Sequence, residues 1–81
     1  MVTKPLSELE PQEKGKIVKV GGKKGIRRRL IDMGVVRGAM VEVQRVAPLG
    51  DPIEIRVKGY DLALRKEEAA NIQVELAEGT L

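Results

Sequence analysis

Apolar and polar residues alternate in three short segments of this 81-residue chain, which are residues 41–44, 53–58 and 72–76. A period of two residues is typical of a β-strand with one face against a core and the other toward water. Val, Ile and Leu supply 24 residues, whereas Tyr60 is the one aromatic residue. Because the core must then be built from aliphatic and largely branched side chains, the sequence predicts a mainly β domain.

Two further segments, residues 16–20 and 62–65, are rich in strand-forming residues and bring the expected number of strands to about five. A sheet of a few short strands has exposed edges and a thin core, and curling into a small, partly open barrel reduces both problems. We expect one domain over residues 1–81, with its core at 6–76 and a loose tail at 77–81.

A different period follows the first long strand. Ile26, Leu30 and Met33 are spaced as i, i+4 and i+7, which places them on one face of an α-helix. Gly34 suits the left-handed backbone that often ends a helix. We therefore expect one short helix over residues 23–33, packed by this face against the sheet, because so short a helix is not stable alone.

The chain contains no Cys and no His. Their absence excludes disulfides, thiol catalysis and zinc ribbons, and it leaves no side chain of near-neutral pKa as a general base. The acidic residues do not follow the spacing of a hard-cation site. We therefore expect no enzymatic activity, no cofactor and no metal site. No apolar stretch reaches the ~20 residues of a membrane span and no signal peptide is evident, so we expect a cytoplasmic protein without membrane insertion.

The densest charged segment is residues 23–29, where five Lys and Arg side chains lie within seven residues. Positive charge at a helix N-terminus opposes the helix dipole, so local stability gives no reason for it. Lys24, Arg27 and Arg28 would point away from the core face. They could serve an anionic partner, or they could form an ordinary solvated helix face with Arg28 paired to Asp32.

Four apolar residues lie outside the predicted core stripe. Ile31 lies off the core face of the helix, Val35 and Val36 follow the helix end, and Leu49 stands in a loop between Pro48 and Pro52. Each could pack onto the edge of the core, or together they could form a partner-facing apolar patch; Ile31 and Leu49 could join the exposed cations in an apolar contact rimmed by arginine. Arg65 is either a surface cation or a support for the following helical turn. We define the predicted partner surface as six residues: Lys24, Arg27, Arg28, Ile31, Leu49 and Arg65.

Three longer motifs carry a resemblance to a known family. They are Arg29-Leu30-Ile31-Asp32-Met33-Gly34, Ala47-Pro48-Leu49-Gly50-Asp51-Pro52-Ile53 and Leu62-Ala63-Leu64-Arg65-Lys66-Glu67-Glu68-Ala69. In this order and spacing, the chain resembles the ferrous iron transport protein A (FeoA) family, although Gln12 stands where the family often has Gly. The resemblance implies a small SH3-like β-barrel with a helix inserted after the first long strand. It also implies a non-catalytic cytosolic accessory protein of FeoB, a ferrous iron transporter with a GTPase domain.

Regulation of iron uptake by contact with the cytosolic GTPase region of a FeoB-type transporter is therefore the function we expect. One alternative is a nucleic-acid-binding barrel that uses residues 23–29, although one Tyr cannot form a stacking platform for bases. A second is the detached SH3-like domain of a metal-dependent repressor, but a complete barrel that starts at Met1 leads us to expect that the chain is no fragment. A third is stimulation of a partner's GTPase by Arg27 or Arg28 acting in trans. The sequence leaves open whether the chain forms homo-oligomers and whether iron binds it directly.

Overall fold

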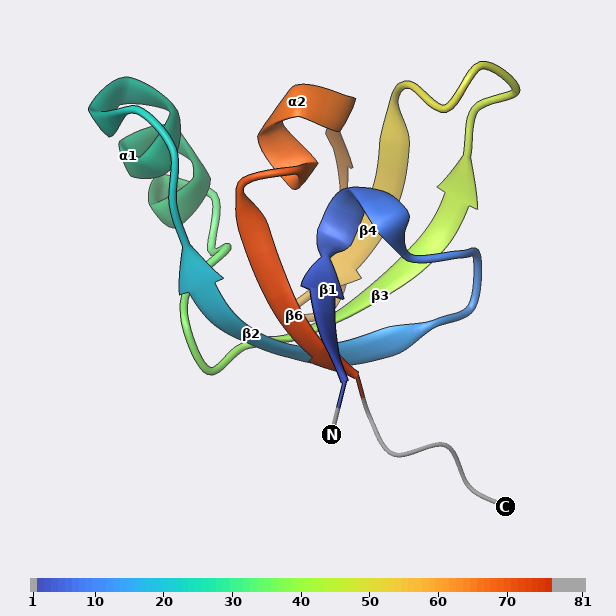
Figure 1. Cartoon of the computed structure of the whole chain (residues 1–81), viewed down its shortest axis with the longest axis horizontal. Coiled ribbons are helices and arrows are strands. Elements are labelled where there is room, and N and C mark those ends of the chain that lie inside the picture. The colour runs from blue at the N-terminus through green and yellow to red at the C-terminus, as the bar shows by residue number, and fades with distance from the viewer. Residues whose placement is uncertain (1, 77–81) are drawn as a thin grey trace.

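The computed structural model describes residues 2–76. Within them, six antiparallel strands form one sheet, and the longest helix has nine residues (Figure 1). The strands are β1 (Thr3–Pro5), β2 (Lys14–Val20), β3 (Met40–Val46), β4 (Ile53–Val57), β5 (Tyr60–Leu64) and β6 (Ile72–Leu76). The helical elements are the 3-10 helix η1 (Leu6–Glu8), the helix α1 (Lys24–Asp32) and the single turn α2 (Lys66–Ala69). A mainly β fold with a short helix after the first long strand confirms the sequence prediction.

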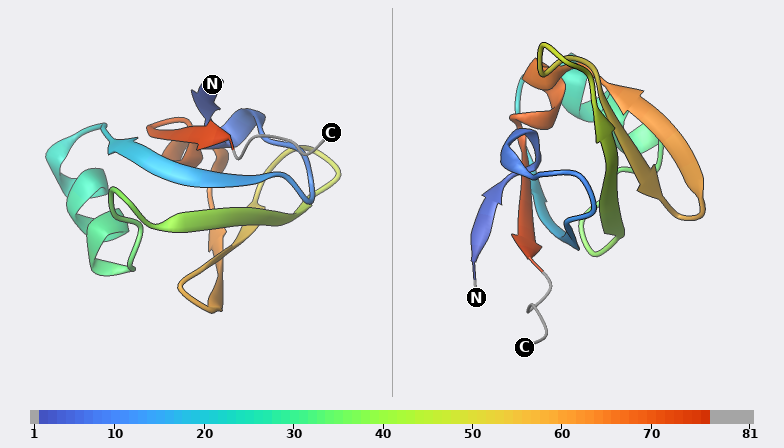
Figure 2. Two further views of the ribbon diagram at one scale, coloured as in Figure 1. Left: turned by 90° about the horizontal axis from the view of Figure 1, so that it is seen from below. Right: turned by 90° about the vertical axis from the view of Figure 1, so that its right-hand side faces the viewer.

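The sheet has the strand order β1-β6-β2-β3-β4-β5. Strand β2 pairs with β3 at residues 14–16 and with β6 at residues 15–20, so it changes its main neighbour along its length. The sheet therefore bends sharply around β2, as the two views of Figure 2 show. Strands β1 and β5 form its two edges and do not pair with each other within residues 2–76. The barrel is thus partly open, as expected.

The structure has six strands within residues 2–76, one more than the five or so that the sequence predicts, because β1 carries no strand pattern in the sequence. Its three residues show no apolar alternation, and one of them is Pro5. The strand exists because β6 supplies a template, with Thr3 opposite Glu75 and Pro5 opposite Gln73. Proline is tolerated there because β1 is an edge strand. No neighbouring strand on its open side needs the N–H that proline lacks.

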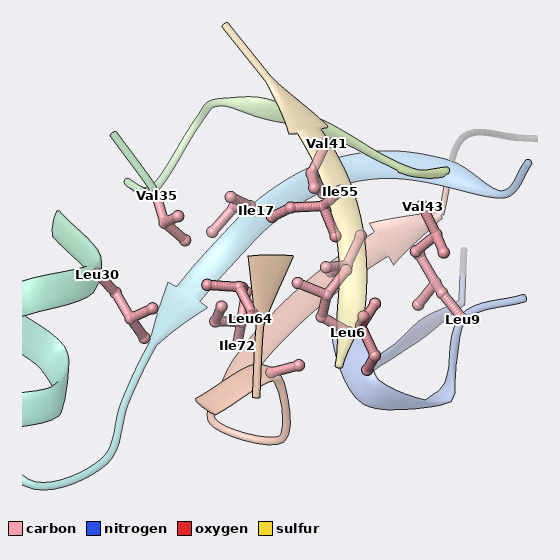
Figure 3. Packing of buried hydrophobic residues seen from close by; sticks show 13 residues of the cluster. Leu6, Leu9, Ile17, Leu30, Val35, Val41, Val43, Ile55, Leu64 and Ile72 are labelled. Atoms are coloured by element: carbon pink, nitrogen blue, oxygen red, sulfur yellow. The ribbon is translucent and has the colours of Figure 1, made fainter. Parts of the chain in front are cut away.

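The core is aliphatic and fills the concave side of the bent sheet (Figure 3). Strands, η1, α1 and the segment after α1 all contribute fully buried side chains to it. Leu30 points from α1 into this interior and is 0% exposed, while Ile26 and Met33 are partly buried against the same cluster. The predicted core face of the helix is therefore confirmed, and α1 depends on it for its position.

Leu30→Ala is expected to destabilise the domain by about 2–5 kcal/mol, because it removes a fully buried side chain and leaves a cavity. Such a loss is a large part of the stability of a domain this small. The matched control is Leu49→Ala, since Leu49 is 93% exposed and its truncation should leave stability within about 0.5 kcal/mol of the parent. Urea unfolding followed by circular dichroism measures both. Equal midpoints for the two variants would show that the helix face is assigned wrongly.

Candidate partner-binding site

Helix α1 lies at one end of the long axis of the molecule, beyond the barrel (Figures 1 and 2). Its C-terminal end is held by Tyr60 of β5, whose hydroxyl donates a hydrogen bond to the carbonyl oxygen of Met33. Gly34 follows with a φ of +92°, and a Cβ there would lie 2.6 Å from the Tyr60 oxygen. The expected left-handed glycine is therefore present, and it also leaves room for the tyrosine that fixes the helix end.

A second connection joins α1 to α2 through Glu68, which is 4% exposed. One carboxylate oxygen of Glu68 accepts the backbone N–H of Arg65 at 2.9 Å, and the other lies 2.5 Å from the Arg29 guanidinium. Arg29 is thus a structural cation. Arg65 supports the turn of α2 through its backbone, as one of the two sequence interpretations proposed, and its side chain is exposed.

The remaining cations of α1 lack such partners. Lys24, Arg27 and Arg28 are exposed, as predicted, and none of them forms an ion pair within residues 2–76. The pairing of Arg28 with Asp32 that the sequence allowed is therefore not formed. Arg27 instead reaches the end of β2, where its Nε donates to the carbonyl oxygen of Val20 at 3.1 Å.

The chain is strongly polarised in charge around this helix. Residues 16–37, which run from β2 through α1, contain eight Lys or Arg and one carboxylate, so their net charge is +7. Because the whole chain carries +3, the remaining residues carry −4. Glu68 of α2 neutralises Arg29, and the remaining positive charge of this segment is of the sign that favours anionic partners.

A groove of about 520 Å³ opens beside α1, between the helix, the end of β2 and the segment that follows the helix. Arg27 and Ile31 of the predicted partner surface are among the residues that line it. Val36, which the sequence allowed in an apolar patch, lines it too, and residues outside the predicted partner surface complete it, namely Val18, Lys19, Val20, Gly21 and Arg37. The sequence does not distinguish Val18 and Val20 as site residues, because a strand end that is paired on one side has the same residue pattern as a fully paired strand.

Leu49 is not adjacent to α1. The predicted partner surface, which placed Leu49 beside the exposed residues of the helix, is therefore not one continuous surface. Strand β3 runs away from the helix end, so the loop over residues 47–52 lies at the opposite end of the long axis (Figures 1 and 2). This loop neighbours α2 instead, where the Asp51 carboxylate accepts the backbone N–H of Lys66 at 3.1 Å. Leu49 therefore lies outside the α1 end. Arg65 stands at the N-cap of α2, beside the Glu68 that pairs with Arg29, and it lines a different, shallow depression that carries charges of both signs.

Residues 2–76 contain no group of three or more His, Cys, Asp and Glu side chains that could hold a metal ion. Every helix described in that range is too short or too polar to cross a membrane.

Comparison with known proteins places these features in a family context. A family model described as the FeoA domain matches residues 4–76. A fusion protein of Fe(2+) transport protein A and Fe(2+) transporter FeoB from Porphyromonas gingivalis is 44% identical over 71 residues. The match covers 88% of this chain and 8% of the fusion protein, so the chain spans a small part of that relative's length.

Solved structures agree with this match. The NMR structure of a FeoA-like protein from Clostridium acetobutylicum has 38% identity and a TM-score of 0.90, and the match covers 100% of this chain and 94% of that one. The crystal structure of Stenotrophomonas maltophilia FeoA complexed with zinc, described as a procaryotic SH3 domain protein, has 30% identity and a TM-score of 0.76, with 93% and 91% covered. The predicted SH3-like fold is therefore confirmed. A manganese-dependent transcriptional repressor at 14% identity shares the fold alone, with a TM-score of 0.87 over 95% of this chain and 38% of the repressor.

Arg29→Gln is expected to destabilise the domain by about 1–3 kcal/mol, because it leaves the buried Glu68 carboxylate without its cationic partner. Arg28→Gln is the matched control, since it removes the same charge from the neighbouring helix position, which forms no ion pair within residues 2–76. Thermal unfolding of both variants measures the difference. Equal melting temperatures would contradict the assignment of Arg29 as the structural cation of α1.

The chain is expected to fold without metal and to bind Fe(II) weakly, because it lacks Cys and His ligands. Melting curves with and without a chelator should coincide, and calorimetric titration with Fe(II) under anaerobic conditions should show no tight stoichiometric site. Zinc is a useful second titrant, because a related protein was solved with it. Stoichiometric Fe(II) uptake that is lost in Glu67→Gln would contradict this expectation.

Proposed function

Since this chain belongs to the FeoA domain family, we propose that it is a cytosolic accessory protein of ferrous iron uptake that binds the cytosolic region of a FeoB-type transporter. The observation that carries the proposal is the fused relative, in which a segment 44% identical to this chain shares one polypeptide with a FeoB transporter. Covalent fusion holds two domains at high effective concentration, which is useful when the separate domains must meet to function. The chain itself supplies no catalytic group in this proposal.

The contact is placed on the α1 end, at Lys24, Arg27, Arg28 and Ile31. The exposed cations there oppose the helix dipole, and Lys23 at the helix N-cap provides no side-chain hydrogen bond. Lys23 and Lys24 at the start of α1 cost helix stability, and Lys24, Arg27 and Arg28 form no ion pair within residues 2–76, so binding is the better reason for this cluster. Arginine around an apolar patch is also a composition that protein interfaces favour. Leu49 lies outside the proposed contact because its loop stands at the opposite end of the long axis, and Arg65 because it lines a different depression, with Asp51 and Lys66.

A second candidate function, nucleic-acid binding, is favoured by the +7 charge of residues 16–37. The two functions differ in their response to salt. Binding to a phosphate backbone weakens steeply and linearly on a log–log plot as salt increases, whereas a contact with an apolar centre weakens much less. Titrations of the transporter's cytosolic region and of a duplex oligonucleotide at several salt concentrations therefore distinguish them.

The direct test is the affinity of this chain for the cytosolic region of a FeoB-type transporter, with and without guanine nucleotide. Arg28→Glu should weaken binding by about tenfold or more, because the loss of a central interface arginine commonly exceeds 1 kcal/mol. Arg45→Glu makes the same charge change on an exposed side chain of β3, away from α1, and should bind like the parent. Leu49→Asp should also bind like the parent.

Two results would contradict the proposal. Absence of binding by the parent chain, in either nucleotide state, would remove the proposed partner. Parental affinity of Arg28→Glu together with weak binding of Leu49→Asp would move the contact to the opposite end of the molecule. Circular dichroism of each variant confirms that the fold is retained, because none of these side chains is part of the core.

A further inference from the structure

We propose that the groove between α1 and the end of β2 binds an extended peptide segment in which an aliphatic residue is flanked by carboxylates. This inference rests on the proposed function in one respect, since such a segment would be the part of the partner that this chain recognises. The groove is defined here by Val18, Val20, Ile31 and Val36 as its floor and by Lys19, Arg27 and Arg37 as its rim.

The floor is aliphatic and comes from three parts of the chain. Val18 and Val20 belong to β2, Ile31 to α1, and Val36 to the segment after the helix. None of the four is fully buried, and only Val20 packs against the main core cluster. The groove therefore leaves apolar surface in contact with water, and a leucine or isoleucine side chain of a ligand would remove that surface from water.

The backbone of the groove favours an extended ligand. Strand β2 pairs with β6 as far as Val20, but its ladder to β3 ends at Lys16. Ile17 makes the last bonds on that side, to Gly38 and Ala39. Within residues 2–76, no strand pairs with residues 18–20 on the side away from β6. A strand end beside an apolar floor favours an extended peptide. The Val20 carbonyl already accepts from Arg27 and the register shifts between Ile17 and Lys19, so the peptide would lie along β2 without a complete ladder of strand hydrogen bonds.

The rim determines the charge of the ligand. The charged residues of the described range 2–76 that line the groove are Lys19, Arg27 and Arg37, and no carboxylate of that range lines it. Arginine binds carboxylates through paired N–H donors, so acidic residues next to the aliphatic one would meet this rim. The surrounding +7 segment attracts the same ligand over a longer range. A nucleic-acid backbone would match the rim but offers no aliphatic group for the floor.

The groove is also held open before any ligand binds. The Tyr60 hydroxyl holds the end of α1 at Met33, Glu68 holds its last turn through Arg29, and Arg27 reaches from α1 to the carbonyl of Val20. These three contacts come from three different elements of the barrel, so the distance between helix and strand does not depend on the ligand. Preorganisation of this kind lowers the cost of binding a flexible peptide.

The test is an NMR titration of the full chain with a capped octapeptide in which glutamates flank two leucines. The expected result is a set of shifted amides confined to residues 18–21, Ile31 and 36–37. In one control peptide serine replaces the leucines, and in the other lysine replaces the glutamates. Each should bind at least about tenfold more weakly than the parent peptide. Two variants, Ile31→Asp and Arg37→Glu, should reduce the affinity for the parent peptide by a similar factor. Arg45→Glu, which changes the charge equally at a site outside the groove, should not.

Several results would overturn this inference. They are shifts that lie outside the groove, equal binding of the lysine peptide, and parental affinity of both variants. Shifts of the same amides when the protein alone is concentrated would identify a second copy of the chain as the occupant. Shifts on addition of phosphatidylglycerol vesicles but not of the peptide would identify a lipid surface instead.

The inference and the proposed function fail in different ways. If the transporter's cytosolic region binds and the groove variants bind it equally well, the function stands and the groove is not its recognition site. If the peptide binds in the groove but the transporter's cytosolic region does not bind at all, the groove stands and its partner is another protein.

Discussion

The change of partner along β2 is the constraint on which the rest of the structure depends. By pairing with β3 at its start and with β6 over most of its length, β2 bends the sheet into a concave surface that the aliphatic core fills. Gly15 lies at this crossing, where a Cβ would come within 2.7 Å of Val74, so only glycine fits without displacing β6. The same geometry leaves the end of β2 open toward α1, and the groove exists there because β3 has already turned away.

Helix α1 is held in place by contacts with residues that are distant in sequence. Because these contacts stabilise it, the helix can carry exposed cations that do not favour its own stability. Arg29 is paired with Glu68, whereas Lys24 and Arg28 have no ion-pair partner within residues 2–76. The first turn of α1 contains no acidic residue, although one would favour the helix dipole. A short helix with unfavourable end charges persists because Leu30 and the Tyr60 contact anchor it. The surface of α1 is therefore free to carry residues that serve binding.

Periodicity predicted most of the fold, because the alternation of β3, β4 and β6 and the spacing of Ile26, Leu30 and Met33 are local signals. It could not predict β1, whose pairing depends on β6 rather than on its own residues. The site was predicted in part: Arg27 and Ile31 line the groove, but Leu49 lies at the far end because the direction of β3 is not a local property. The roles of Glu68 and Tyr60 depend on residues that are 39 and 27 positions away in the chain.

The central claim is that the α1 end of this chain contacts a FeoB-type transporter through the groove beside β2. Amide hydrogen exchange, with and without the transporter's cytosolic region, tests it most directly because it reports every backbone N–H at once. The account predicts slower exchange at residues 18–20 and over the segment 34–37, with no change in the loop over residues 47–52. Slower exchange confined to that loop, or none anywhere at saturating partner concentration, would contradict it.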